Sequence, residues 1–343
     1  MQQHHNNTRS FSTALSVRRT LLKWMLPALC APALLAGGAA QAANTYPDNR
    51  PIHLVVPFPA GGGTDFIGRL LATELAKELK TSVVVENKGG ANSNVGTSYV
   101  SQAKPDGYTL LLSGVGISTN QSLYSKLPYK LDDLDHIATL AFGSDVLVTS
   151  PGFPATSFEE FLEMARKDPG KYTYASSGNG TSGHLGMEML KMRADIDLTH
   201  IPYNGGAAAI NDILAGRVDV LFLNQDTVLS HVRAGKMRAL AIGSAERNPI
   251  YPETRTFSEA GLEGFSSEYW FGLSAPAGLP ADVLDTLFNA TKKAMQSPMI
   301  QERLGAVGLV IPELNDKMGY NKLVHSEVKK WGEVVQASGA KID

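Results

Sequence analysis

The stretch from Ile52 to Leu79 constrains the fold of this chain most. It begins with the apolar, β-branched run Ile52–Val56, passes through a turn with three consecutive glycines, Gly61–Gly63, and continues with apolar residues three and four apart. This pattern predicts a buried strand, a glycine turn and an amphipathic helix whose N-cap oxygen comes from Thr64 or Asp65. Backbone N–H groups and the positive end of the helix dipole would then meet at one open point, which can bind an anion without Lys or Arg.

Two other interpretations of this stretch were weighed. Glycine-rich turns also make tight corners with no ligand. A dinucleotide-binding fingerprint is suggested by Glu86, which follows the next apolar run about twenty residues on. Its third glycine, however, would fall at Phe66, and no Gly-Lys-Ser/Thr follows, as a Walker loop requires. The spacing therefore argues against nucleotide binding.

The first 42 residues have the composition of an export signal rather than of a folded domain. They contain four Lys or Arg, no Asp or Glu, an apolar run interrupted by Pro27 and Pro32, and the small-residue pattern Ala40-Gln41-Ala42 at the end. Arg18-Arg19 also resembles a twin-arginine signal, so ordinary secretion and twin-arginine export both stay open. We expect a cleaved leader and a periplasmic protein.

Removal of this leader would change both charge and cysteine content. The net charge of −2 would become −6, because four positive charges are lost, and an acidic exported protein is a poor nucleic-acid binder. The one cysteine, Cys30, would be lost as well, so no disulfide, thiol chemistry or cysteine metal site is expected. The histidines have no metal-binding spacing. We therefore predict neither a metal nor a cofactor.

Strand and helix signals alternate along the rest of the 343 residues, which is typical of an α/β fold with mostly parallel sheets and flanking helices. Small polar residues follow three predicted strands, at 57–65, 87–94 and 113–120. Ligands of open α/β sheets bind at such carboxyl ends. The same pattern of a strand followed by small polar residues recurs after Tyr172–Ala175, where a loop of Gly, Ser and Thr residues, 176–184, leads into another helix.

Two sets of such units predict two lobes. Lobe 1 is assigned to 43–145 plus 270–343 and lobe 2 to 146–269, joined by extended segments near 140–150 and 264–274. Helix starts from both lobes could hold one anion between them, and the lobes would close when the ligand bridges them.

Ser182 and His184 suggest an exported serine hydrolase as an alternative. Gly180–Gly183 is not the Gly-x-Ser-x-Gly elbow, because His184 stands where its last glycine belongs. A catalytic role is therefore not predicted, and no catalytic residue is assigned. The aromatic run Tyr269–Phe271 leaves another choice open, since a strand alternates its faces and Trp270 could line the cleft or the core.

Several motifs, in order, cover nearly all of the chain after the leader. Pro57–Asp65 resembles the "PFPPGGxxD" signature of the Bug (TctC-like) proteins, the periplasmic substrate-binding proteins of tripartite tricarboxylate transporters. Similar family motifs are matched at Glu86–Ala91, Pro105–Thr109, His200–Gly205 and Asp212–Val218. Each motif alone is weak, but the ordered set is specific.

This resemblance implies a two-lobed Venus-flytrap fold, type II-like, that captures a small carboxylate and presents it to membrane permease subunits. It implies no enzyme activity, and we expect a monomer; a ligand-sensing partner of a signalling receptor is the alternative for the same fold. Three departures from the family pattern, at Ala60, Asn204 and Leu223-Asn224, leave the ligand open. The missing Asp at Leu223-Asn224 argues against a ligand ammonium group.

The predicted site combines the loops of both lobes. Backbone N–H groups and hydroxyls, that of Thr181 included, are expected to hold the anion, and a side chain at Gly62 would obstruct it and strain a positive φ. The predicted ligand-binding residues are Phe58, Ala60, Gly61, Gly62, Gly63, Thr64, Asp65, Ser113, Ser176, Ser177, Thr181, Ser182, His184, Tyr203, Asn204 and Asn224.

Overall fold

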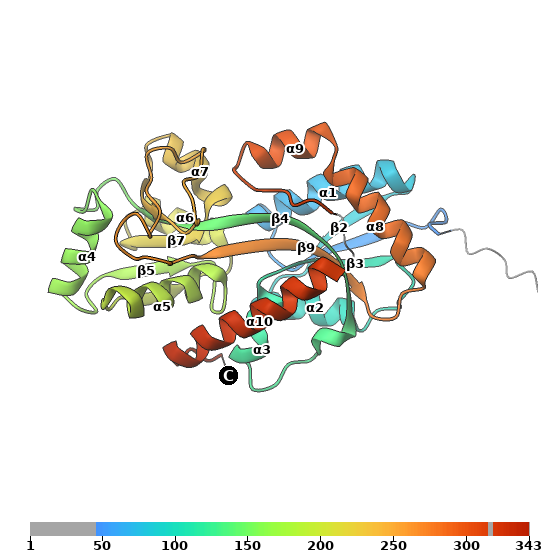
Figure 1. The fold of residues 1–343 in the computed structure, drawn as a ribbon, viewed down its shortest axis with the longest axis horizontal. Coiled ribbons are helices and arrows are strands. Elements are labelled where there is room, and N and C mark those ends of the chain that lie inside the picture. The colour runs from blue at the N-terminus through green and yellow to red at the C-terminus, as the bar shows by residue number, and fades with distance from the viewer. Residues whose placement is uncertain (1–45, 315–317, 343) are drawn as a thin grey trace, which may run out of the picture. The chain divides into compact units, whose positions relative to one another are not determined.

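A computed structural model describes residues 46–314 and 318–342, and the predicted leader lies outside them (Figure 1). The described chain is a mixed α/β fold with two lobes, which confirms the predicted fold class. Nine strands form its sheet, in the order β2-β1-β3-β9-β4-β7-β5-β6, with β8 paired to β4. No helix within these residues is long and apolar enough to cross a membrane.

The first lobe is built on three parallel strands. Strands β1 (Ile52–Val56), β2 (Val83–Asn87) and β3 (Thr109–Gly114) pair in parallel with β1 in the middle. The crossover helices are α1 (Gly63–Leu79) and α2 (Asn94–Ser101). The strand-turn-helix unit predicted over 52–79 is therefore confirmed.

The cap predicted for α1 is wrong in one detail. The helix begins at Gly63 with Gly62 as its N-cap, and no side chain caps it. Gly62 takes the N-cap position because the helix already begins within the run of three glycines. Thr64 and Asp65 therefore lie inside the first turn and cannot be its N-cap.

The second lobe repeats this construction with different residues. Parallel strands β5 (Thr173–Ser176), β6 (Thr199–Pro202) and β7 (Val220–Asn224) have β5 in the middle. The remaining elements of this lobe are α4 (Phe158–Lys167), α5 (Ser182–Ala194), α6 (Gly206–Leu214), α7 (Gln225–Arg233) and β8 (Arg238–Ile242).

Two long antiparallel strands connect the lobes. Strand β4 (Leu134–Thr149) pairs with β9 (Glu268–Pro276), and its last residues pair instead with β7 and β8 (Figure 1). Sequence patterning identified only 146–149 as a strand. The rest was missed because β4 is buried along nearly its whole length and therefore shows no alternation.

The C-terminal helices cover the first lobe. Helix α8 packs on α1, and α10 packs on α3 and also reaches α5 of the second lobe (Figure 1). The bounds of the remaining helices are α3 (Gly116–Leu123), the 3₁₀ turn η1 (Leu131–Asp133), α8 (Ala281–Met295), α9 (Pro298–Gly305) and α10 (Met318–Ser338).

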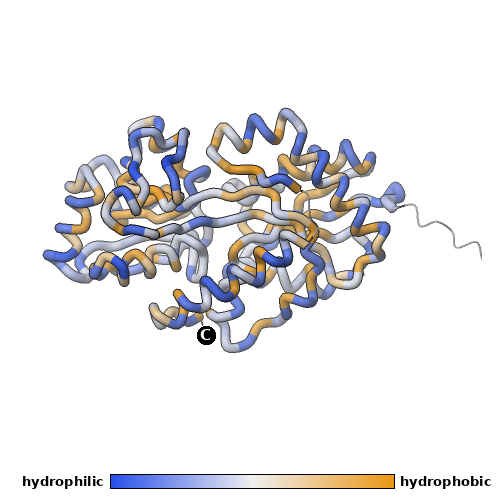
Figure 2. The backbone as a smooth tube through the Cα atoms, in the orientation of Figure 1, coloured by the Kyte–Doolittle hydropathy of each residue, from blue (hydrophilic) through white to orange (hydrophobic). Residues whose placement is uncertain are grey.

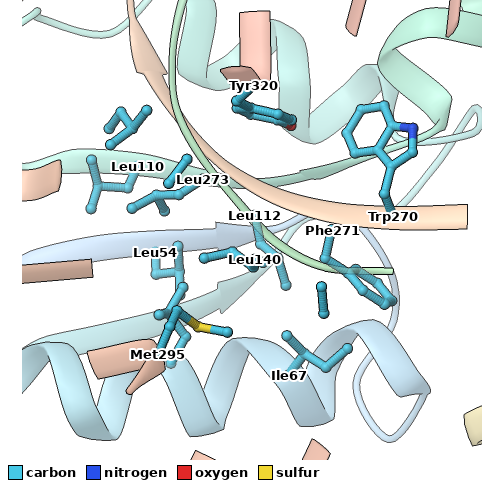
Figure 3. Close-up of a cluster of buried hydrophobic side chains, with 14 of the residues drawn as sticks. Leu54, Ile67, Leu110, Leu112, Leu140, Trp270, Phe271, Leu273, Met295 and Tyr320 are labelled. Carbon is cyan, nitrogen blue, oxygen red and sulfur yellow. The ribbon is translucent and has the colours of Figure 1, made fainter. Parts of the chain in front are cut away.

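Each lobe has its own hydrophobic core. Helix α1 buries Ile67, Leu71 and Leu75 in one cluster with Leu54 and Leu110 of the sheet. Figure 3 shows Ile67 below the sheet residues of this cluster. Full burial of such a side chain stabilises the fold by about 1.5–3 kcal/mol. Along the outer helices hydrophilic residues alternate with hydrophobic ones (Figure 2). In the second lobe separate clusters pack on the two sides of the sheet. The carboxyl ends of the parallel strands are thus held in fixed positions.

Candidate functional site

A cavity of about 110 Å³ lies between the two lobes. Six loops line it, and each follows a parallel strand and leads into a helix, so the cavity faces six helix N-termini. Backbone N–H groups without intrahelical partners point outward from such starts, and the helix dipoles favour negative charge there. The helices begin at Gly63, Asn94, Gly116, Ser182, Gly206 and Gln225.

Most of the predicted ligand-binding residues line this cavity. They come from both lobes, as the two-lobe argument expects. The predicted residues at the cavity wall are Phe58, Ala60, Gly62, Gly63, Thr64, Ser113, Ser177, Thr181, Ser182, Asn204 and Asn224.

Gly61 and Asp65 lie beside the cavity wall and shape it. Gly61 adopts a φ of +87°, whereas Gly62 has an ordinary φ of −89°, so the positive φ expected at Gly62 belongs to Gly61. The Asp65 carboxylate accepts hydrogen bonds from the Gly61 N–H (3.0 Å), Arg69 Nε (2.9 Å) and Asn87 Nδ2 (2.9 Å). Burial opposes ionisation, but these hydrogen bonds hold the pKa of Asp65 below its usual range. Asp65 therefore fixes the glycine turn.

Ser176 and His184 support the second-lobe loop from behind. The Gly180 N–H donates to His184 Nδ1 (3.0 Å), and the Ser176 hydroxyl contacts His200 Nε2 (2.8 Å). The two imidazole rings stack with centroids 4.3 Å apart. Burial lowers the pKa of His184, in keeping with a neutral ring that accepts at Nδ1. Neither residue lines the cavity.

Tyr203 lies at an adjoining cavity that shares Phe58, Ser177 and Asn204 with the first. Its hydroxyl donates to Asp212 Oδ2 (2.7 Å). Tyr203 therefore lies beside the predicted site rather than at its wall.

Two predicted hydroxyl donors already use their protons inside the protein. Thr181 Oγ1 donates to the Gly178 carbonyl (2.8 Å) and caps α5 by accepting from the His184 N–H (3.4 Å). The Ser113 hydroxyl forms a hydrogen bond with the Tyr320 hydroxyl (2.6 Å) and is also hydrogen-bonded to buried residues of β9. Both residues shape the wall, and neither has a proton to spare for a ligand in this arrangement.

Ser182 and His184 are not arranged as a nucleophile and its base. The Ser182 hydroxyl donates to Asp145 Oδ1 (3.1 Å), while His184 Nδ1 accepts from a backbone N–H. A serine nucleophile needs a base that takes its proton. In this geometry His184 is not that base, because the Ser182 hydroxyl donates to Asp145 and His184 Nδ1 is occupied by the Gly180 N–H.

Several wall residues were missed by sequence reasoning. Ser93 is buried, its hydroxyl has no hydrogen-bond partner, and its backbone φ is +73°. Ala91 and Asn92 before it are left-handed as well. Three such non-glycine residues in a row are strained, and strain of this kind gathers at functional sites. No local pattern in the sequence indicates this conformation.

The aromatic run of β9 lines the cavity with all three residues, Tyr269, Trp270 and Phe271. The Trp270 indole itself points to the opposite side of the strand from Phe271 (Figure 3). It packs edge-on against Tyr320 and donates to Glu327 Oε2 (3.4 Å). Trp270 therefore anchors α10, while Phe271 and Tyr269 lie on the other face.

The cavity wall carries a single acidic side chain, Asp226, and no Lys, Arg or His among the described residues. Asp226 is the second residue of α7, just after β7. Asn224 is predicted to bind the ligand because it is a polar residue at the end of a strand, and the same argument applies to Asp226. The argument from the missing Asp at Leu223-Asn224 stays a prediction, but the cavity wall does carry a carboxyl group two residues after Asn224.

The lobes touch each other across this cavity. Thr119 Oγ1 of α3 donates to the Gly180 carbonyl of the second lobe (2.9 Å). At Gly63, an added Cβ would lie 2.3 Å from Asp226 Oδ2 and 2.8 Å from Thr227 Oγ1. The start of α1 therefore fits against α7 only because residue 63 has no side chain.

Comparison with known proteins agrees with this architecture. The model of the tripartite tricarboxylate transporter family receptor, TctC, matches residues 67–340. Among solved structures, periplasmic binding protein BugD is 34% identical with a TM-score of 0.82, covering 86% of this chain and 99% of BugD. The Rhodopseudomonas palustris protein Rpa4515 with adipate is 30% identical (TM-score 0.81; 84% and 97% covered), and MatC of the same organism with bound malate is 30% identical (TM-score 0.79; 83% and 99% covered).

The family match spans most of the chain, and the same two-lobed fold recurs in relatives of at least 30% identity over nearly their whole length. The motif-based resemblance is thereby confirmed. The chain belongs to the TctC family of tripartite tricarboxylate transporter receptors, which are periplasmic solute-binding proteins.

Proposed function

We propose that this protein captures a small organic carboxylate in the cavity between its lobes and presents it to the membrane permease subunits of a tripartite transporter. The observation that carries the proposal is the convergence of six helix N-termini on one cavity, whose wall carries no basic side chain in the part of the chain that the structure describes. An anion can be bound there by backbone N–H groups alone. Relatives with adipate and malate bound are consistent with this chemistry.

The energetics of such a site are sufficient. A hydrogen bond to a charged group contributes about 1.5–3 kcal/mol, and micromolar affinity requires about −8 kcal/mol in total. Four or five donors from the helix starts would reach that value. Ser93 also lies at the wall, and its buried hydroxyl has no hydrogen-bond partner among the described residues.

We infer that residues 1–42 direct export to the periplasm and are then cleaved, and that the protein acts there as a monomer. Its acidic charge after cleavage disfavours nucleic acid as a partner. Lobe 1 is taken as 43–145 plus 270–343 and lobe 2 as 146–269, so that closure bends the chain near β4 and β9.

Native mass spectrometry of the mature protein, purified without refolding, tests this function. We expect a bound small carboxylate that is released on denaturation. Calorimetric titration with di- and tricarboxylates and aromatic acids then ranks the candidates. Absence of any bound or binding carboxylate would contradict the proposal. Turnover of ester substrates that Ser182→Ala abolishes would instead support the hydrolase.

A further inference from the structure

Asp226 is an unexpected residue in a site for anions. It lines the cavity, and its Oδ2 faces the start of α1 in the other lobe, close enough to exclude a Cβ at Gly63. No Lys, Arg or His lines the described cavity to balance its charge. A ligand that carries only carboxylates would therefore place like charges near each other in a partly dehydrated space, which is unfavourable.

The hydrogen bonds of Asp226 leave one oxygen with free capacity. Oδ1 accepts a short hydrogen bond from the Tyr269 hydroxyl. Oδ2 has only a long contact with Thr227 Oγ1, at 3.5 Å. Burial raises the pKa of Asp226 and so disfavours its charged form, while the hydrogen bonds oppose this shift. A further donor at Oδ2, above all a positively charged one, would stabilise the ionised carboxylate.

The same side of the cavity offers a second acceptor. When Asp145 is ionised, the Ser182 hydroxyl donates to it, so that its oxygen presents lone pairs rather than a proton to the cavity. The second lobe therefore offers acceptors at Asp226 and Ser182, in addition to the backbone N–H donors of its helix starts.

We propose that Asp226 is a specificity-determining residue that accepts a hydrogen bond from an amino or hydroxyl substituent of the ligand. The ligand class is then a carboxylate that carries such a donor, not an unsubstituted one. An ammonium group should be preferred over a hydroxyl because it also compensates the charge of Asp226. This inference rests on the proposed function and narrows it.

Ligands that differ only in the substituent test the inference. Calorimetric titration of the mature protein uses three matched sets: succinate, malate and aspartate; glutarate, 2-hydroxyglutarate and glutamate; and propanoate, lactate and alanine. In each set that binds, we expect the amino form to bind tightest, and the unsubstituted form to bind weakest by about tenfold or more. Equal or tighter binding of the unsubstituted acid to the wild-type protein would by itself overturn the inference.

The variant Asp226→Asn keeps the shape of the side chain and removes its charge. It should reduce the preference for the amino form by about tenfold while leaving the unsubstituted acid bound as tightly or more tightly. Asp168→Asn is the matched control, since Asp168 is a solvent-exposed carboxylate of the same lobe that does not line the cavity. It should leave all affinities unchanged. A preference that survives Asp226→Asn would overturn the assignment.

These outcomes separate the two proposals. If no member of the three sets and no other carboxylate binds, the proposed function fails, and this inference fails with it. If carboxylates bind without regard to the substituent, the proposed function stands and only the role of Asp226 is wrong.

Discussion

A single methyl group added at Gly63 should weaken ligand binding without impairing folding. In the substitution Gly63→Ala, the new Cβ would fall 2.3 Å from Asp226 Oδ2 and 2.8 Å from Thr227 Oγ1, both in the opposite lobe. Within its own lobe the change is favourable, since Ala is a better helix former than Gly by up to about 1 kcal/mol. The clash therefore acts on lobe closure alone.

The cost of this clash can be estimated from what must move. Displacing the Asp226 side chain breaks its hydrogen bond from Tyr269, which costs about 1–3 kcal/mol, and overpacking of a tight contact costs a similar amount. If the ligand is bound only when the lobes meet, Kd should rise by about 5- to 150-fold. The thermal midpoint of the ligand-free protein should not fall.

Gly305→Ala is the matched control, because a Cβ there meets nothing within 4 Å and Gly305 lies in α9, away from the cavity wall. Calorimetry reports affinity, and small-angle X-ray scattering with saturating ligand reports closure. We expect compaction for the wild type and for Gly305→Ala, and a persistently extended profile for Gly63→Ala. Wild-type affinity together with wild-type compaction in Gly63→Ala would refute the reasoning.

Three further predictions concern stability. Burial raises the pKa of Asp145 to about 7, against hydrogen bonds from two serines; since the folded protein then holds a proton that the unfolded chain has released, the contribution of Asp145 to the free energy of unfolding should fall as pH rises from about 4 to about 7. Burial lowers the pKa values of His136, His184 and His200, which act in the opposite direction over this range, so the test is the difference between wild type and Asp145→Asn in denaturant titrations. The free energy of unfolding of the wild type relative to Asp145→Asn should fall with rising pH, and an equal slope in both would contradict the assignment. Ser93→Gly relieves a left-handed backbone and removes an unpartnered hydroxyl, so it should raise the free energy of unfolding by about 1 kcal/mol; a decrease in chemical denaturation would contradict the strain argument. Thr181→Val removes the cap of α5, so thermal unfolding should register a loss of about 1 kcal/mol; calorimetry should register little change in affinity, whereas a large loss would show that the hydroxyl serves the ligand.

Local sequence signals predicted the strand-loop-helix units well. Apolar β-branched runs followed by Gly-rich loops, as at Ile52–Val56 and Tyr172–Ala175, define a strand end and a helix start within about ten residues of one another. Since parallel strands place their carboxyl ends along one edge, the loops after them could be predicted to share a site. The cavity confirms that the loops come together.

Long-range packing explains what could not be predicted. The contact between Gly63 and Asp226 depends on how two helices from different lobes meet, and no spacing in the chain encodes it. The pairing of β4 with β9 likewise joins segments more than a hundred residues apart. Thr181 is predicted to serve the ligand because its residue type suits an anion, and the residue type does not reveal that its hydroxyl donates to the Gly178 carbonyl.

The crystal structure of the mature protein with its tightest-binding carboxylate is the most direct test of ligand capture between the lobes. The ligand carboxylate should lie in the cavity within hydrogen-bond distance, directly or through one ordered water, of helix-start N–H groups from both lobes, among them those at Gly63 and Ser182. A carboxylate bound outside this cavity, or held by Lys or Arg side chains, would contradict the account.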